Sequence, residues 1–360
     1  MKRRPIVFLI ALLAGLGLTL WAASRLRQPV TQAAGRPEGQ PAIAFLSPAE
    51  VSEAWLTELD GSAARQITNT GGRVTSLEAL PDGSRLVVVV LNDQGGSDLR
   101  LLNWDGSNPL LLVDCGADLC SQPAASPDGR WLAYNRAAAD APDRPVPWLL
   151  ELADGDTYPL ELDPLILAEV FSWSPDSSRL AFYDPAAGGI RVRSMSDGQE
   201  VVLETNIAQA GSWSPDGQEL TVNVEEAFGG FVSMKVYLHH FQTGQSRILL
   251  GVAEDDASDY SLPAWSPDGN WLAYGTLRLA GSPAKQIWLI RPDGSGARAI
   301  TDDLARAHAN YQWSPDGSRL AFQRFALGSS GSAPELLVWE MESDETQAIA
   351  QDAIHPVWAP

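Results

Sequence analysis

The sequence predicts an all-β protein, a seven-bladed β-propeller closed by a blade that N- and C-terminal strands share. The first observation is a Pro-Asp dipeptide, usually followed by Gly, that recurs along the chain. Its Asp residues are Asp82, Asp128, Asp176, Asp216, Asp268 and Asp316. The intervals between them are 46, 48, 40, 52 and 48 residues. A period in the forties with turn residues at constant offsets is typical of propeller blades.

The second observation is that each repeat reads as four short strands. A short apolar strand leads into Ser-Pro-Asp-Gly, where Pro fixes φ, the Asp side chain bonds backbone amides and Gly takes the strained position. A second strand follows, as in residues 86–90, and a third ends in another turn, as in residues 288–296. Residues 297–301 show the fourth strand. Apolar and β-branched runs bounded by Gly, Pro and Asp clusters are what strands look like.

The third observation concerns the two ends of the propeller region. Residues 42–46, 54–59 and 65–68 read as a second, third and fourth strand that lack a first strand. Residues 355–360 read as a first strand that stops inside its own turn motif. The two parts complement each other, so we expect one blade to be assembled from both. Such closure removes the exposed sheet edges of an open array.

The motifs that begin at Trp173, Trp265 and Trp313 read Trp-Ser-Pro-Asp. They resemble the TolB-type propeller repeat, a relative of Trp-Asp repeats found mainly in bacterial exported proteins, and the resemblance covers about residues 41–360. It implies the fold and no particular activity. TolB itself has an α/β domain before the propeller, where we expect only a linker here, so TolB's own interactions are not implied. Related propellers precede peptidase domains or act as pectate-fragment lyases with metal-binding His residues.

The N-terminal part divides into a signal-anchor or transmembrane segment, residues 1–25, and a flexible linker, residues 26–40, before the propeller of residues 41–360. Three basic residues at positions 2–4 precede an uncharged run over positions 5–24, which is long enough to cross a bilayer as a helix. The basic cluster predicts a cytoplasmic N-terminus and a single-pass protein with an extracytoplasmic propeller. The alternative is a cleaved signal peptide and a secreted or periplasmic protein.

The charge of the predicted propeller excludes one class of partner. Residues 1–40 hold six of the 25 basic residues and one of the 45 acidic residues, so the remainder carries 19 basic and 44 acidic residues, a net charge of −25. A surface this acidic argues against binding nucleic acid or anionic lipid head groups. It favours basic proteins or cations, although solubility alone explains the total charge.

The two cysteines, Cys115 and Cys120, stand between the last strand of one predicted blade and the first strand of the next. An even number of cysteines in an exported chain predicts a disulfide. Their spacing is not Cys-x-x-Cys and neither has a His nearby, which makes a redox or metal role the weaker interpretation.

The strand order sorts the loops into two faces. The Pro-Asp-Gly turns and the third-to-fourth strand turns lie on one face, and their repeated chemistry predicts a structural role. The opposite face carries variable loops, where function tends to sit on a repeated scaffold. Candidate ligand-binding residues there are Asp255, Asp256, Asp259, Tyr260, Asp302, Asp303, His308 and His355. Clustered carboxylates attract a positively charged protein or a hard cation, but none matches a calcium loop, and no cofactor is expected.

Catalytic motifs are scarce. The four histidines are His239, His240, His308 and His355, and there is no His-Glu-x-x-His and no Gly-x-Ser-x-Gly elbow. His239 and His240 fall in one predicted strand and point to opposite faces. The sequence therefore predicts a membrane-tethered, non-catalytic module that binds a protein partner or surface ligand on the variable-loop face. The alternative is a metal-assisted polysaccharide lyase or hydrolase of the cell envelope that uses His308 and His355.

Overall fold

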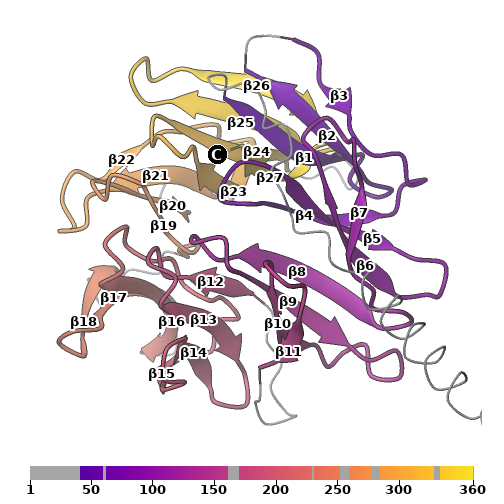
Figure 1. Cartoon of the computed structure of the whole chain (residues 1–360). Helices are drawn as coiled ribbons and strands as arrows, with labels where there is room; N and C mark the ends of the chain where they lie inside the picture. Colours follow the sequence, from indigo (N-terminus) through magenta and orange to yellow (C-terminus); the bar gives the residue numbers. More distant parts are fainter. Residues whose placement is uncertain are drawn as a thin grey trace, which may run out of the picture.

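The computed structural model describes residues 41–59, 62–160, 170–228, 231–251, 259–277, 284–327 and 333–359. Within these residues the chain forms seven antiparallel sheets arranged as the blades of a propeller (Figure 1), which confirms the all-β, seven-bladed prediction. No helix in this part is both long and apolar enough to cross a bilayer. The predicted segments 1–25 and 26–40 lie outside the described residues.

Blade 1 joins the two ends of the propeller, as predicted. Its sheet has the order β27-β1-β2-β3, with these bounds: β27, Ile354–Trp358; β1, Ala42–Ser47; β2, Glu53–Glu58; β3, Arg65–Gln66. Trp358 pairs with Ile43, and Ala359 N donates to Ala42 O at 2.9 Å. The yellow C-terminal strands and the indigo N-terminal strands therefore meet in Figure 1.

Blades 2 to 4 each have four strands in consecutive order. Blade 2 comprises β4, Val74–Ala79; β5, Leu86–Leu91; β6, Ser97–Leu102; β7, Leu110–Val113. Blade 3 comprises β8, Leu119–Ala125; β9, Trp131–Ala137; β10, Val146–Glu151; β11, Thr157–Pro159. Blade 4 comprises β12, Phe171–Trp173; β13, Arg179–Asp184; β14, Gly189–Ser194; β15, Glu200–Glu204.

Blade 5 differs from its neighbours because its first strand is reduced to one bridge, between Trp213 and Leu220. Its strands are β16, Glu219–Phe228; β17, Phe231–His240; β18, Gln245–Leu250. Blade 6 comprises β19, Ala264–Trp265; β20, Leu272–Thr276; β21, Gln286–Ile290; β22, Arg298–Ala299. Blade 7 comprises β23, Arg306–Trp313; β24, Arg319–Ala326; β25, Glu335–Glu340; β26, Thr346–Gln351.

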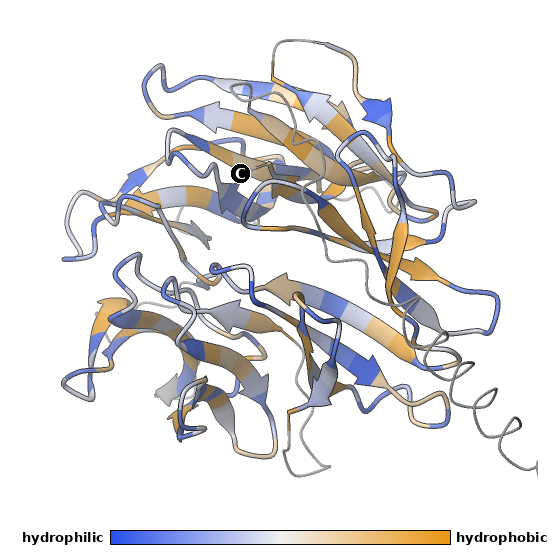
Figure 2. Ribbon diagram, in the orientation of Figure 1, coloured by the Kyte–Doolittle hydropathy of each residue, from blue (hydrophilic) through white to orange (hydrophobic). Residues whose placement is uncertain are grey.

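The hydrophobic core is divided among the junctions between blades. Each of seven buried clusters contains side chains from two neighbouring blades, including the junction of blade 7 with blade 1, where Leu336 packs with Phe45 and Trp358. Figure 2 shows the apolar residues concentrated along the strands of the blades. Stability is therefore built from nearest-neighbour interfaces, as in other repeat proteins.

The repeated tryptophans also link neighbouring blades by hydrogen bonds. The indole Nε1 of Trp173 donates to Ala124 O at 3.0 Å, and that of Trp313 donates to Ala264 O at 3.1 Å. The same bond joins Trp213 to Ser172 and Trp358 to Gln312. In each case the acceptor lies four residues before the turn Asp of the preceding blade.

Trp265 breaks this pattern, because its Nε1 is buried without a partner among the described residues. The exception falls where blade 6 meets blade 5, whose first strand is reduced to a single bridge.

Candidate functional site

The antiparallel sheets give the propeller two faces of different construction. One carries the first-to-second and third-to-fourth strand turns, and we call it the turn face. The other carries the second-to-third strand connections and the connections between blades, and we call it the loop face. Strands of neighbouring blades contact one another around the axis, as β4 contacts β8 and β8 contacts β12.

The turn face uses one arrangement repeatedly. Ser266 Oγ donates to Asp268 Oδ1 at 2.5 Å, and Asn270 N donates to the same oxygen at 3.0 Å. The equivalent bonds form at Asp128, Asp176, Asp216 and Asp316. Burial opposes ionisation of Asp268, but these hydrogen bonds outweigh it and lower its pKa. The Oδ1 atom of each carboxylate thus holds its own turn together.

The loop face is held by the first residue of the third strand in four blades. Glu53 accepts backbone N–H groups from Thr70 at 2.6 Å and from Gly72 at 2.8 Å. Desolvation acts to raise the pKa of Glu53, but these bonds and those from Thr68 and Thr70 hydroxyls lower it overall. Its carboxylate therefore fixes the connection from blade 1 to blade 2.

Ser97, Gln286 and Glu335 occupy the same place in blades 2, 6 and 7. Ser97 Oγ exchanges hydrogen bonds with the backbone of Cys120, and Gln286 Nε2 donates to the carbonyls of Asp303 and Arg306. Glu335 accepts from Arg306 and Arg324 at 2.7 and 2.6 Å. The connection from blade 2 to blade 3 and that from blade 6 to blade 7 are thus anchored by different chemistry.

The acidic residues predicted on the loop face have different roles. Asp302 is exposed, whereas Asp303 accepts Ala305 N at 3.0 Å and helps shape its own connection. Asp259 is about half exposed and pairs with Lys285 at 2.9 Å. Asp255 and Asp256 lie outside the described residues, so their ligand-binding role stays a prediction.

Two other predicted residues lie in the interior of the propeller. Tyr260 is 2% exposed, and its ring lies 6.0 Å from that of Tyr274. His308 is 3% exposed and packs edge-on against Phe322. The sequence placed His308 before the first strand, whereas β23 already begins at Arg306. A ligand in solvent reaches neither side chain in this structure.

Burial decides the charge of His308. Desolvation, helped by the nearby Arg324 guanidinium, lowers its pKa to about 4, so the ring is neutral at pH 7. Its Nδ1 is buried without a partner in the described part of the chain, and a bound water is expected there.

His355 is exposed and has a left-handed backbone conformation that residues of two other blades share. It has φ of 51°, and Gln122 and Asn310 have φ of 51° and 52°. All three are exposed and lie on first strands where the pairing register shifts. Each stands three residues before the position of the repeated Trp, which is Ala125 in blade 3. Such bulges turn a side chain out of the regular pleat. The same offset in the other blades has no positive φ, so the offset alone does not predict them.

Among the described residues, no three His, Cys, Asp or Glu side chains lie close enough together to hold a metal ion. His239 and His240 lie in β17, as predicted for a third strand. His239 Nδ1 is 3.0 Å from Ser246 Oγ, and burial lowers its pKa.

The two cysteines form a disulfide on the loop face. Cys115 and Cys120 are joined with a Cα–Cα distance of 6.3 Å, and both are buried. The loop between them packs against Gly96, where an added Cβ would meet the carbonyl oxygens of Asp118 and Gly116 at 2.3 and 2.4 Å. The bridge therefore braces the β5–β6 hairpin against the next blade.

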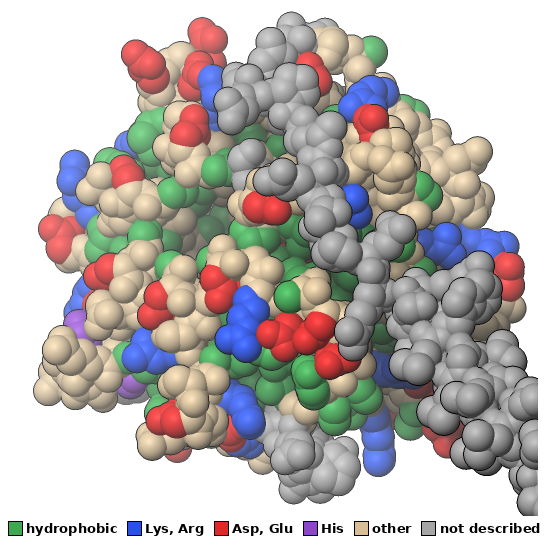
Figure 3. Space-filling view, in the orientation of Figure 1, with side chains coloured by type: hydrophobic (Ala, Val, Ile, Leu, Met, Phe, Trp, Pro, Cys, Tyr) green, Lys and Arg blue, Asp and Glu red, His purple; other side chains and the backbone are tan. Residues whose placement is uncertain are grey.

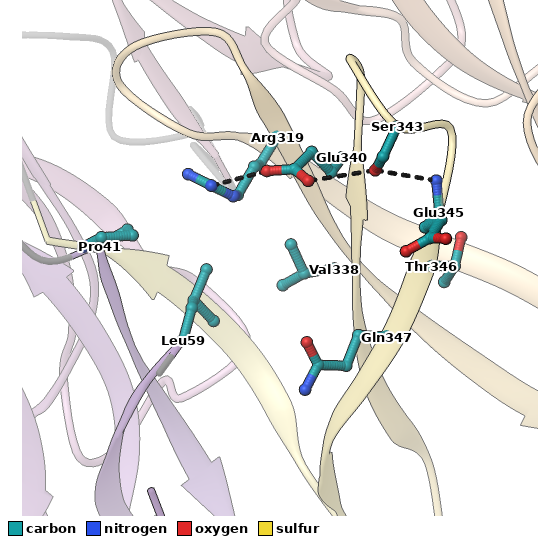
Figure 4. A pocket seen from close by; sticks show the side chains of 9 residues that line it. All are labelled: Pro41, Leu59, Arg319, Val338, Glu340, Ser343, Glu345, Thr346 and Gln347. Atoms are coloured by element: carbon teal, nitrogen blue, oxygen red, sulfur yellow. Dashed lines mark hydrogen bonds and ion pairs between the residues drawn. The ribbon is translucent and has the colours of Figure 1, made fainter. Parts of the chain in front are cut away.

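A pocket of about 400 Å³ lies where blade 7 meets blade 1, on the turn-face side (Figure 4). Arg319 donates to Glu340 at 2.7 Å, and Ser343 Oγ donates to the other carboxylate oxygen at 3.1 Å. Figure 4 shows these groups bonded to one another along one wall. The charged groups of this wall are thus paired with one another.

A second pocket, of about 340 Å³, lies on the loop face between blades 1 and 2. Arg73 and Arg100 line it together with Asn69, Thr70 and Gln94. The sequence does not reveal this pocket, because the two arginines are 27 positions apart and each reads as an ordinary surface residue. No motif indicates that folding brings them together.

No family model matches the chain. An uncharacterized protein of Agrobacterium fabrum (strain C58) is 28% identical over 194 residues, which is 51% of this chain and 59% of that protein. The match thus spans less than two thirds of the length of that relative.

Solved propellers are similar to the chain at low sequence identity. The putative TolB of Agrobacterium tumefaciens is 21% identical with a TM-score of 0.52, and 70% of this chain and 87% of that chain are covered. TolB of Acinetobacter baumannii is 16% identical with a TM-score of 0.52 and coverage of 88% and 82%.

An oligogalacturonate lyase in complex with manganese is similarly related, at 16% identity, a TM-score of 0.53 and coverage of 78% and 74%. At these identities the likeness concerns the fold, and proteins with different activities share it. The chain has a TolB-like β-propeller fold.

Proposed function

We propose that this protein is a membrane-tethered, extracytoplasmic propeller that binds a protein partner on its loop face without catalysing a reaction. The observation that carries the proposal is the construction of that face, where buried polar side chains hold the connections and charged side chains remain exposed beside them. A surface of this kind is pre-organised, which lowers the entropy cost of binding.

The connections flanking blade 6 show the arrangement most clearly. Asp259 and Lys285 form an ion pair with exposed fractions of 48% and 30%, and Arg306 bridges Asp303 and Glu335. Exposed pairs of this kind contribute little to stability, but they present fixed charges to a partner and steer its approach. Figure 3 shows acidic side chains in several parts of the surface, with Lys and Arg among them. Recognition is therefore local and does not depend on total charge alone.

The membrane tether rests on the sequence. Basic residues at positions 2–4 and the uncharged run over positions 5–24 support a single N-terminal span with the propeller outside the cytoplasm. Carbonate extraction of membranes tests it: an anchored chain stays with the membrane, and a cleaved chain is released and lacks its first residues by mass spectrometry.

Affinity capture with the tagged full-length chain in neutral detergent tests the binding role. The test variant replaces Asp255, Asp256 and Asp302 by Lys and leaves Asp303 intact, because the Asp303 carboxylate holds its own connection. We expect a stoichiometric protein to be recovered by the native chain and lost with the variant.

The matched control carries the same change in charge on the turn face, at Asp156, Glu342 and Glu345, which are exposed. Capture unchanged by the control and lost with the test variant places the partner on the loop face. Equal loss with both variants contradicts a specific face, and recovery of no protein contradicts the binding of a protein partner.

A further inference from the structure

The pocket between blades 1 and 2 is built from two segments that hold each other in place. One wall is the connection through Thr70 and Arg73, and the other is the β5–β6 hairpin around Asn92. Leu91 N donates to Arg73 O at 2.9 Å and joins the two walls directly. Thr70 Oγ1 accepts Arg73 N at 2.9 Å and donates to the buried Glu53.

The hairpin wall is equally fixed. Asn92 Oδ1 accepts the backbone N–H groups of Gln94 and Gly96, and its Nδ2 donates to Asp98 and to Gly116 O. Every hydrogen-bonding position of this amide is occupied, so the hairpin keeps its shape without a ligand.

Arg100 lines this pocket with a side chain that is 43% exposed, and part of its hydrogen-bonding capacity is unused. Its Nε is buried and has no acceptor in the described part of the chain. The nearest carboxylate oxygen is Asp98 Oδ2, 3.9 Å from Nη2, which is beyond hydrogen-bond distance. Asp98 Oδ1 is already used by Asn92 and by Cys115 N. A buried guanidinium N–H without an acceptor in the chain takes one from a water or a ligand, and Arg100, unlike His308, lines a pocket that a ligand can enter.

Arg73 supplies the second cation and shows which chemistry it accepts. Its Nη1 contacts the carboxylate of Asp93 at 2.5 Å, and the Asp93 side chain is 89% exposed. An ion pair this exposed contributes little free energy. A carboxylate entering from solvent replaces Asp93 at small cost, because it exchanges one charge-assisted bond for another.

We propose that this pocket binds a carboxylate group, held between the guanidinium groups of Arg100 and Arg73, with the amides of Asn69 and Gln94 at its rim. Its volume of about 340 Å³ is at the lower end for small-molecule sites, and suits a small organic acid or the last residue of a peptide. The site is separate from the surface around Asp259 and Asp302, so either proposal can fail without the other.

Isothermal titration of the full-length chain in neutral detergent tests the site with three probes. They are acetyl-trialanine with a free C-terminal carboxylate, the same peptide as its C-terminal amide, and lactate. We expect saturable binding of the free-acid peptide and none of the amide. Binding of lactate with similar affinity identifies a free small acid as sufficient, whereas binding of the peptide alone assigns the site to a chain terminus.

Four variants then locate the binding. Arg100→Gln should weaken it by about tenfold or more, as expected for loss of a charge-assisted hydrogen bond. Arg73→Gln should also weaken it, and Asp93→Asn should strengthen it by about two- to fivefold, because a competing carboxylate is removed. Arg130→Gln on the turn face, where Arg130 pairs with Glu151, is the matched control and should bind as the native chain does.

Thermal unfolding shows whether each variant keeps its fold. Equal binding of the acid and amide peptides, undiminished binding by a folded Arg100→Gln variant, or no saturable binding below roughly 10 mM would overturn the proposal. A crystal structure that shows only water on Arg100 Nε in the presence of the free-acid peptide would do the same.

Discussion

The turn face and the loop face both hold strand ends together, but the turn face repeats one arrangement and the loop face uses several. On the turn face one arrangement recurs, as Ser266 with Asp268 and Ser314 with Asp316 show. On the loop face the inter-blade connections are held by Glu53, Ser97 and Gln286, each of which is the first residue of a third strand. The comparison teaches that repeated turns specify the ring, while the anchoring of the loops tolerates change in residue type. This freedom is compatible with the binding function proposed for the loop face.

The largest expected loss of stability comes from disrupting blade 1, which closes the propeller. Deletion of residues 354–360 removes β27, including Trp358, which is 4% exposed. We expect a loss of more than about 5 kcal/mol, because buried indole contacts and a whole strand of hydrogen bonds are lost. The melting temperature should fall by about 10 °C or more, as measured by calorimetry.

Trp358→Ala keeps the strand and removes only the indole and its bond to Gln312 O. It should cost about 3–5 kcal/mol. A melting curve unchanged by either alteration would contradict closure through β27.

The next largest effect is the difference in stability cost between replacing an Asp on the turn face and replacing one on the loop face. Asp268→Ala removes the carboxylate that accepts bonds from Ser266 Oγ and Asn270 N, and should cost about 1–2 kcal/mol. Asp302→Ala, at an exposed loop-face position, should change stability by less than about 0.5 kcal/mol. Urea unfolding of both variants measures the difference, and equal costs would contradict the division between faces.

The pH dependence of Asp268 sharpens the same comparison. Hydrogen bonds from Ser266 and Asn270 overcome the opposing effect of burial and lower its pKa in the folded state. The folded state then binds protons less readily than the unfolded chain, so this stability is present above the unfolded pKa of about 3.9 and is lost as pH falls through the folded pKa. The stability difference between native chain and Asp268→Asn should therefore shrink below about pH 4. A difference that grows in acid would contradict this role.

The sequence was sufficient for the ring and insufficient for the site, and particular residues show why. Pro-Asp-Gly turns are local, since residues two apart bond each other, and a one-dimensional pattern reveals them. His308 was misplaced because β23 extends upstream through Ala307 and Ala309, which carry no strong strand preference. As part of β23, the His308 imidazole is buried instead of exposed to a ligand.

The pocket of Arg73 and Arg100 was beyond sequence reasoning for a different reason. Arg73 directly precedes β4 and Arg100 lies in β6, and the pairing of both strands with β5 brings the two residues to one pocket. Distances of this kind depend on tertiary structure, and no spacing rule predicts them.

The smallest effect concerns the one turn in which Ser replaces Gly. Ser177 has φ of 58°, a conformation that costs an L-residue about 1 kcal/mol. Gly217, Gly269 and Gly317 fill this position in later blades and lie against Pro175, Pro215 and Pro267 of the preceding turn. Ser177 instead accepts Asp128 N through its Oγ at 2.9 Å, so a side-chain bond between turns stands in for the Gly-on-Pro contact.

Two substitutions at Ser177 separate the cost of its left-handed backbone from the contribution of its hydrogen bond with Asp128 N. Ser177→Ala keeps the strained backbone and loses the acceptor, and should cost about 0.5–1.5 kcal/mol. Ser177→Gly loses the same acceptor but relieves the strain, while a freer unfolded chain offsets part of the gain. It should stay within about 0.5 kcal/mol of the native chain. Chemical denaturation of the pair decides the point: if Ala is tolerated as well as Gly, the left-handed backbone at this turn carries no strain. The hydrogen bond to Asp128 would then be the whole contribution of Ser177.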